Sequence, residues 1–477
     1  MQRTGYRKRS LAAVIVTRIL FGVATLAMLA IAPVQSALAR DAAVRGSSAA
    51  PNAAPVYPLK PSANRRYLVD QNNVPFLMVG DAPQSLIGNL TVAEAGQFMD
   101  NRRSYGINTL WINLLCDSYT ACNADATTFD GIAPFTTPGD LSTPNPDYFA
   151  RVDSMLAAAA SRGMVVLLDP IETGGFMQML RDNGLTKARA YGRYLGRRYK
   201  NVPNIIWMHG NDFQSWRDEA DNDLVIAVAK GIRATDPNHI QTAELDYLVS
   251  ATLDDPGMRS VVDLNAIYTY RPTYAKILQE YRRRNFQPMF MVEANYEFEH
   301  NGGTDGGTTP NLRRQEYWTM LSGTTGQLYA SAYTWTFQFD WQNNLDTPGV
   351  LQFSYMRQLF AARAWYDLVP DRPHQVFTGG RGHFSTEDPI PDDTYVTAAA
   401  TPDGTLAMAY LPFARKITVD MSKLSGPVTA RWFDPTNNTF TAIAGSPFAN
   451  SGSRQFMPPG NNSAGDGDWV LVLEVLG

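Results

Sequence analysis

The sequence contains very few cysteines. Cys116 and Cys122 are the only two, and five residues separate them. Neither stands in a setting typical of a zinc ligand or of a catalytic nucleophile. In an oxidising compartment the pair would close a small disulfide loop; otherwise both would stay free thiols. The sequence leaves these two alternatives open.

Several catalytic motifs are also missing. The five histidines form no metal-binding pair on a helix face, and no Gly-x-Ser-x-Gly elbow is present. No G-x-G-x-x-G follows the first expected strand. The glycine-rich run at residues 302–307 lacks the lysine of a phosphate-binding loop. We therefore expect neither a metallohydrolase nor an esterase, no metal, and no cofactor.

Excess positive charge is confined to the start of the chain. The net charge is −4, and it becomes −9 without residues 1–39, which hold five basic and no acidic residues. An acidic protein is a poor partner for nucleic acid or an anionic membrane. A hydrophobic content of 44% and an aromatic content of 11% favour a large packed core over disorder.

The first 39 residues resemble a signal peptide. A basic start is followed by an apolar stretch at residues 19–32 and by Ala37-Leu38-Ala39, which suits a signal peptidase. Arg18 interrupts the apolar region, which disfavours the alternative of an uncleaved membrane anchor. Residues 40–56 are small and polar and read as a linker. We expect an exported protein, either periplasmic or secreted.

From residue 57 to residue 370, strand and helix patterns alternate eight times. The strands are expected at residues 75–80, 107–115, 164–168, 204–208, 239–245, 261–268, 288–292 and 329–337. Buried parallel strands read as continuous apolar runs, as these do. The pattern predicts an α/β fold, a (β/α)8 TIM barrel. A doubly wound open sheet is the alternative, but it would normally have fewer strands.

Two helix starts carry clear capping signals. Thr91 and Glu94 form a Ser/Thr-x-x-Glu capping box. Asn145 precedes Pro146, which suits the first turn of a helix. Both signals place a helix directly after an expected barrel strand or its loop.

Residues 371–477 have a different character. Short β-rich segments are separated by turns such as Asp403-Gly404 and Asn437-Asn438. This pattern is typical of a small antiparallel β-sandwich, which we expect as a second domain.

Polar residues gather at or just after the ends of the barrel strands. In a TIM barrel the carboxyl ends of the strands carry the active site. Asp212 and Glu293, each after an apolar run, are the candidate catalytic pair. The other candidates, expected to contact substrate, are Asp81, Asn113, Asp169, His209, Asn211, Glu244, Tyr268, Tyr296, Glu297 and Trp335.

Two carboxyl groups at one end of a barrel suit the cleavage of a glycosidic bond. One must stay protonated to assist the leaving oxygen, and the other must stay ionised to attack carbon or to activate water. Aromatic side chains near the same strand ends could stack on sugar faces. These features predict a glycoside hydrolase. A carbohydrate- or matrix-binding protein without activity is the alternative.

The chain resembles the apiosidase-like glycoside hydrolases. The resemblance rests on PFLMVGD at residues 75–81, RRSYGIN at 102–108, NPDYF at 145–149, NIIWMHGND at 204–212, PMFMVE at 288–293 and RQEYW at 314–318. Residues from 371 onward resemble the collagen-binding-type β-domain that often follows this family's barrel.

The resemblance implies roles for individual residues. Asp212 takes the place of the acid/base and Glu293 that of the nucleophile, which implies a retaining mechanism. Asn211 takes the place of a residue that contacts the 2-hydroxyl group of the sugar. The implied substrate is a polysaccharide or its side chains, with furanosides such as apiosides included.

Overall fold

The computed structural model describes residues 54–301 and 306–475. The predicted signal peptide at residues 1–39 and most of the predicted linker at residues 40–56 lie outside the described residues, and both stay predictions. Within the described ranges, no helix has the length and apolar character needed to cross a membrane.

The central sheet of the described chain has eight parallel strands. They are β4 (Met78–Asp81), β5 (Thr109–Asn113), β6 (Val165–Asp169), β7 (Ile205–His209), β8 (Gln241–Ala243), β10 (Asn265–Thr269), β11 (Met289–Glu293) and β12 (Gly326–Tyr329). β12 pairs in parallel with β4. The carbonyl of Gln241 accepts the N–H groups of Asp263 and Leu264, just before β10. The sheet thus closes into the predicted barrel.

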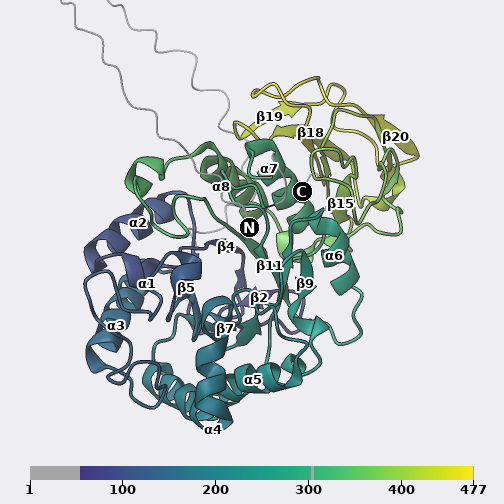
Figure 1. Ribbon diagram of the computed structural model, residues 1–477. Coiled ribbons are helices and arrows are strands. Elements are labelled where there is room, and N and C mark those ends of the chain that lie inside the picture. Colours follow the sequence, from purple (N-terminus) through teal and green to yellow (C-terminus); the bar gives the residue numbers. More distant parts are fainter. Residues whose placement is uncertain (1–53, 302–305, 476–477) are drawn as a thin grey trace, which may run out of the picture. The chain divides into compact units, whose positions relative to one another are not determined.

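Helices surround the strands, as Figure 1 shows. They are α1 (Leu86–Asn89), α2 (Val92–Ser104), α3 (Pro146–Ser161), α4 (Thr173–Tyr199), α5 (Glu219–Arg233), α6 (Thr273–Glu280), α7 (Thr309–Leu321) and α8 (Pro348–Ala361). Both predicted caps are confirmed. Thr91 and Glu94 form a reciprocal capping box at α2, and Asn145 caps α3 with Pro146 as its first residue.

The connection from β8 to β10 departs from the regular repeat. In the described chain it contains no α-helix, but the short strand β9 (Val249–Ala251), which pairs antiparallel with β10. Two 3₁₀ turns follow, η2 (Thr252–Asp254) and η3 (Met258–Ser260). Pro256 and Gly257 stand between them, and both residue types disfavour a continuous helix.

The predicted position of the eighth strand is wrong. The strand is β12, which ends at Tyr329, where the prediction begins. The aromatic, β-branched run that follows forms a turn, in which Thr334 and Trp335 both donate N–H groups to the carbonyl of Ser331. Residues with strong β propensity therefore serve here as a loop at the carboxyl end of the barrel, because tertiary context overrides propensity.

Short elements complete the barrel domain. Strands β1 (Lys60–Pro61), β2 (Leu68–Val69) and β3 (Pro75–Phe76) form a small antiparallel sheet before the barrel. The 3₁₀ turns η1 (Ser118–Thr120), η4 (Trp341–Asn344) and η5 (Trp365–Asp367) lie in connections.

The second domain is the predicted antiparallel β-sandwich. One sheet contains β13 (Val369–Pro370), β15 (Thr397–Ala400), β16 (Leu406–Leu411), β21 (Trp469–Val475), β18 (Val428–Asp434) and β19 (Thr439–Ala442). The other contains β14 (Phe377–Gly379), β17 (Ile417–Asp420) and β20 (Ser453–Phe456), and the turn η6 (Met421–Lys423) follows β17. An apolar cluster fills the space between the two sheets.

Helix α7 lies between the barrel and the β-sandwich. The rings of Tyr317 on α7 and Tyr410 on β16 stack with centroids 5.0 Å apart. The guanidinium of Arg313, 1% exposed, pairs with Asp466 and Asp468 of the second domain. Residues of the larger sheet belong to the same apolar cluster as the outer layer of the barrel. The two domains therefore share a core.

The ion pairs of Arg313 are expected to be important for stability. Arg313→Ala leaves Asp468 buried without its cation, which should lower the free energy of unfolding by about 3–5 kcal/mol. Arg162→Ala is the matched control, because its partner Asp100 is 61% exposed, and it should cost about 0–1 kcal/mol. Urea denaturation measures both. A loss in the free energy of unfolding that is no larger for Arg313→Ala than for Arg162→Ala would contradict this role of the buried ion pairs.

Candidate active site

Asp212 lies in a constrained turn after β7. Gly210, Asn211 and Asp212 have φ values of 114°, 61° and 49°, all in the left-handed region. A Cβ at Gly210 would lie 2.0 Å from the carbonyl oxygen of Glu244, so only glycine fits there. Asparagine and aspartate tolerate this region better than most residues. Such backbone strain tends to cluster at functional sites.

The Asp212 carboxyl group is buried and held from two sides. Its Oδ2 accepts a short hydrogen bond from the hydroxyl of Tyr119, and its backbone N–H donates to Glu244 Oε2 at 3.1 Å. Its Oδ1 has no hydrogen-bond partner among the described residues. Burial raises the pKa of Asp212 above its usual range, and the hydroxyls of Tyr119 and Tyr268 partly oppose this shift. The protonated form is therefore favoured more than in water.

Glu293, the last residue of β11, has hydrogen-bond donors on both oxygens. Tyr270 donates to Oε1 at 2.6 Å and Tyr296 to Oε2 at 2.5 Å. Burial, and then the charge of Asp212, raise the pKa of Glu293 to about 8, although the hydroxyls of Tyr270 and Tyr296 oppose this shift. Hydrogen bonds to both oxygens favour the ionised form of Glu293, whereas burial together with Asp212 favours its protonated form, so the two carboxyl groups are expected to share one proton.

Tyr268 connects the two carboxyl groups. It pairs in register with Glu293 across β10 and β11, and its hydroxyl lies 2.8 Å from that of Tyr270. Hydrogen bonding by Tyr268 lowers the pKa of both Asp212 and Glu293. Asp212 and Glu293 therefore lie close together, and each raises the energy of the other's charged form.

A chain of side-chain amides and hydroxyls links Asn211 to Glu293. Asn211 Nδ2 donates to Gln84 Oε1 at 3.0 Å, and Gln84 Nε2 donates to the hydroxyl of Tyr296 at 3.1 Å. The hydroxyl of Tyr296 in turn binds Glu293. This chain orients Asn211 and Tyr296, two of the predicted substrate contacts, against the rest of the site.

Further buried carboxyl groups surround the pair. Glu244 is 1% exposed, and burial together with Glu293 and Asp212 raises its pKa well above the usual range. Burial likewise raises the pKa of Asp169 and brings that of Glu172 to about 8. Within the described chain, each of these three carboxyl groups keeps one oxygen without a partner. Asp169 and Glu244 thus lie beside the pair, and their contact with substrate stays a prediction.

Two predicted substrate contacts instead belong to the framework. Asp81 is fully buried and binds Nε of Arg102 at 2.5 Å. Glu297 accepts hydrogen bonds from the Tyr329 and Thr347 hydroxyls and from the backbone N–H of Gly349, at the start of α8. Asp81 is the last residue of β4, and Glu297 lies in the loop four residues after β11, but the oxygens of both are already engaged. We therefore remove Asp81 and Glu297 from the substrate-binding set.

His209 and Asn113 are also bound within the protein. His209 Nε2 lies 2.7 Å from Gln241 Oε1, and burial lowers the pKa of His209 to about 4, so the ring is neutral at neutral pH. Asn113 accepts a hydrogen bond from the indole of Trp111 and donates one to Glu172. Both side chains support the strand ends of the site.

Trp335 lies in the loop after β12, beyond the strand. Its ring is half-buried, and its centroid is 6.2 Å from that of Tyr296. Because Tyr296 donates to Glu293, this ring pair places Trp335 beside the carboxyl cluster. The strand predicted for residues 329–337 was wrong, but Trp335 still lies near Tyr296 at the carboxyl end of the barrel.

The structure adds three residues that sequence reasoning missed. Tyr119 contacts Asp212, Gln84 joins Asn211 to Tyr296, and Glu172 holds the loop that carries Tyr119. Gln84 and Glu172 each lie three residues after an aspartate that ends a strand, and this position is the one feature of the sequence that could have identified them. Tyr119 lies between the two cysteines, which the structure joins in a disulfide.

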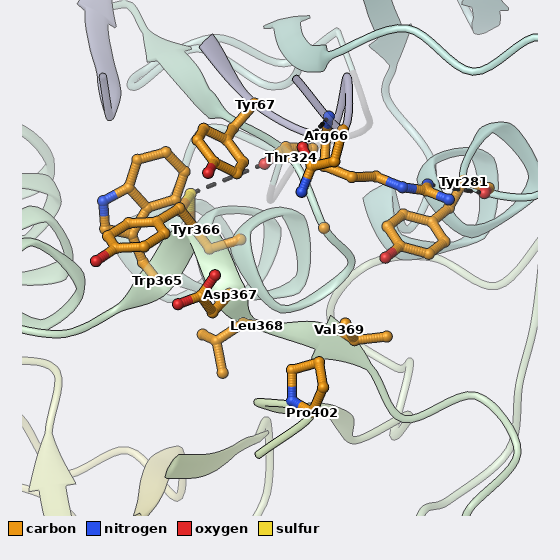
Figure 2. A pocket seen from close by; sticks show the side chains of 13 residues that line it. Arg66, Tyr67, Tyr281, Thr324, Trp365, Tyr366, Asp367, Leu368, Val369 and Pro402 are labelled. Atoms are coloured by element: carbon orange, nitrogen blue, oxygen red, sulfur yellow. Dashed lines mark hydrogen bonds between the residues drawn. The ribbon is translucent and has the colours of Figure 1, made fainter. Parts of the chain in front are cut away.

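No metal site emerges from the described residues, since no group of three or more potential ligands is arranged to hold an ion. A pocket of about 120 Å³, drawn in Figure 2, is lined by Gly323 and Thr324, which come just before β12, so it lies at the opposite, amino-terminal end of the barrel strands. There Arg66 extends over the ring of Tyr281 and donates to its carbonyl. Tyr67 and Trp365 lie on the other side. None of the carboxyl cluster lines this pocket.

Comparison with solved structures finds the same fold in proteins whose titles name glycoside hydrolases. A family 5 glycoside hydrolase from Bacteroides vulgatus superposes with a TM-score of 0.76 at 22% identity, over 87% of this chain and 93% of the other. A second structure, titled "Glycoside hydrolase", gives 0.75 at 22% identity, over 87% and 96%. A further B. vulgatus structure, titled as a putative glycoside hydrolase, gives 0.59 at 12% identity, over 90% and 84%.

Family models match both domains. Residues 386–474 match the model described as "Putative collagen-binding domain of a collagenase". Comparison with curated proteins gives no match. Residues 62–367, well over half of the chain, match the "Apiosidase-like, catalytic domain" model. The chain therefore belongs to the apiosidase-like family and is a glycosidase, an enzyme that acts on a carbohydrate.

Proposed function

We propose that the protein is a retaining glycosidase in which Asp212 is the acid/base and Glu293 the nucleophile. One observation carries this assignment. The two buried carboxyl groups share Tyr268 as a neighbour, but Glu293 has a tyrosine donor on each oxygen whereas Asp212 Oδ1 has none in the described chain. Burial raises the pKa of both groups, and this difference in hydrogen bonding is what favours the charge on Glu293 and the shared proton on Asp212.

In the first step, Glu293 attacks the anomeric carbon and the bond to the glycosidic oxygen breaks. Asp212 gives its proton to that oxygen, which leaves as a neutral alcohol. In the second step, Asp212 removes a proton from water, the water oxygen attacks the anomeric carbon, and Glu293 departs as a carboxylate. Each step moves one proton through Asp212, so the enzyme returns to its starting state.

The proposed substrate is a glycosidic bond in a polysaccharide or its side chains, including furanosides such as apiosides. Trp335 and Tyr296 supply aromatic faces for a sugar ring next to Glu293. Asn211, oriented by Gln84, is the proposed partner of a sugar hydroxyl. Asp169 and Glu244 offer further acceptor oxygens in the same region.

We also propose that the protein is exported to the periplasm or beyond. The basic and apolar start of the sequence supports this proposal, as does the disulfide between Cys116 and Cys122, since such bonds persist in oxidising compartments. Sequencing the amino terminus of protein recovered outside the cytoplasm should give a mature start at Arg40. A start at Met1 in exported protein would contradict cleavage there.

Amide substitutions test the two catalytic roles. Asp212→Asn and Glu293→Gln should each lower kcat on a hydrolysable aryl glycoside by about 10²–10⁴-fold, because each removes a proton donor or a nucleophile. The melting temperature should change little. The matched controls Asp420→Asn and Glu219→Gln, outside the site, should keep full activity.

Two outcomes would decide against the proposal. If both site variants turn over at the rate of the native protein, the assignment fails. If the native protein binds glycans but hydrolyses none of a broad panel of aryl glycosides and polysaccharides, the inactive binding protein becomes the better account.

A further inference from the structure

The loop of residues 116–122, here called the cysteine loop, is closed by a disulfide and carries Tyr119 in its middle. The disulfide lies directly on α1. A Cβ at Gly88 would be 2.8 Å from the sulfur of Cys116 and 2.7 Å from that of Cys122. Only a residue without a side chain allows this approach, so α1 forms a close-fitting support for the disulfide.

The start of α4 supports the other side of the cysteine loop. Glu172 Oε2 accepts the N–H of Asp117 at 3.1 Å and the hydroxyl of Thr120 at 2.7 Å. A Cβ at Gly175 would lie 2.0 Å from the carboxyl carbon of Asp117. The loop therefore rests flush against the first turn of α4.

The same turn of α4 also holds the turn that carries Asp212. The N–H of Thr173 donates to the carbonyl of Gly210 at 2.7 Å, and the N–H of Gly174 donates to that of Asn211 at 3.0 Å. A Cβ at Gly174 would touch the ring of Tyr119 at 3.3 Å. One helix end thus fixes the cysteine loop and the Asp212 turn against each other.

We propose that the cysteine loop is a positioning element for the acid/base, acting through the hydrogen bond from Tyr119 to Asp212 Oδ2. This proposal rests on the proposed role of Asp212. Tyr119 occupies Oδ2, and Oδ1 has no hydrogen-bond partner among the described residues, so Oδ1 is the oxygen that exchanges its proton with the glycosidic oxygen and then with water. Tyr119 keeps its own proton throughout, and its hydroxyl stabilises the carboxylate that each proton transfer leaves behind.

The contact also adjusts the acidity of Asp212. The titratable groups that face Asp212 are Tyr119, Glu244, Asp246, Tyr268, Tyr270 and Glu293. Tyr119 comes from the cysteine loop, while the others lie in or just after the neighbouring strands β8, β10 and β11. A hydroxyl that donates to a carboxylate favours the charged form. Loss of the Tyr119 hydroxyl should therefore raise the pKa of Asp212.

Three variants disturb this arrangement in different ways. Tyr119→Phe removes the hydroxyl, and Gly175→Ala displaces the Asp117 carboxyl group, which accepts the N–H of Tyr119, with the disulfide intact. Cys116→Ser with Cys122→Ser opens the loop. Tyr366→Phe is the matched control, since Tyr366 lines the pocket at the opposite end of the barrel. Circular dichroism and melting temperature identify any variant that fails to fold.

The readouts are the pH dependence of kcat/KM on an aryl glycoside and a ¹³C-carboxyl NMR titration of aspartate-labelled protein, with Asp212 assigned by Asp212→Asn. In Tyr119→Phe the alkaline limb of kcat/KM and the Asp212 titration should both move up by about one pH unit. Gly175→Ala and the opened loop should lower kcat/KM by about tenfold or more. When either loop change is added to Tyr119→Phe, it should alter kcat/KM by less than about twofold further, because all of these variants act through the same contact between Tyr119 and Asp212.

Three results would overturn the proposal. The pKa of Asp212 could stay unchanged in Tyr119→Phe, or it could shift by the same amount in the control Tyr366→Phe. The loop variants could also lower kcat/KM by the same factor with Tyr119→Phe present as without it. The NMR titration needs no turnover. It therefore tests the contact between Tyr119 and Asp212 even if no glycoside is hydrolysed. Absence of activity in the native protein would contradict the proposed function alone.

Discussion

Two carboxyl groups buried together without a cation are the constraint on which the site depends. Asp212 and Glu293 are 7% and 6% exposed. Within the described chain, the groups that shift their pKa values are tyrosine hydroxyls and another carboxylate, with no lysine or arginine among them. Asp81, by contrast, has the guanidinium of Arg102. A cation would hold both carboxylates ionised, whereas hydroxyls leave one of them free to keep a proton.

The barrel supplies the rigidity that such a pair needs. Parallel strands bring side chains that are far apart in the sequence to the same edge of the sheet, and the register of β10 and β11 sets Tyr268 directly beside Glu293. The turn at Asp212 is less regular and needs more support, which the N–H groups at the start of α4 and the carboxylate of Glu244 provide. The buried interface at α7 extends the same core into the second domain.

Much of this arrangement could be predicted from the sequence, because it follows from local patterns. Continuous apolar runs marked the parallel strands, and the carboxylates that end them marked Asp212 and Glu293. The run after Tyr329 misled the prediction, because its aromatic residues suit a strand but here form a loop beside Tyr296. Asp81 and Glu297 had the right position in the chain, but only the fold reveals that Arg102 and α8 engage them.

Other contacts could not be read from the chain because they depend on close approach between distant segments. Tyr119 meets Asp212 across 93 residues of sequence, through a loop whose fit relies on the absence of side chains at Gly88 and Gly175. The stacking of Tyr317 on Tyr410 joins two domains that the sequence pattern shows only as separate. Such contacts depend on close packing in three dimensions, where one added methyl group, as in a glycine-to-alanine change, would prevent the two segments from approaching each other.

The most direct test of the central claim is to locate the covalent intermediate. The protein would be quenched with acid during turnover of an activated aryl glycoside, digested, and examined by mass spectrometry. The account predicts one glycosyl group attached through an ester to Glu293, in the peptide that contains β11. A glycosyl group on Asp212, or turnover that yields an inverted product and no labelled peptide, would contradict it.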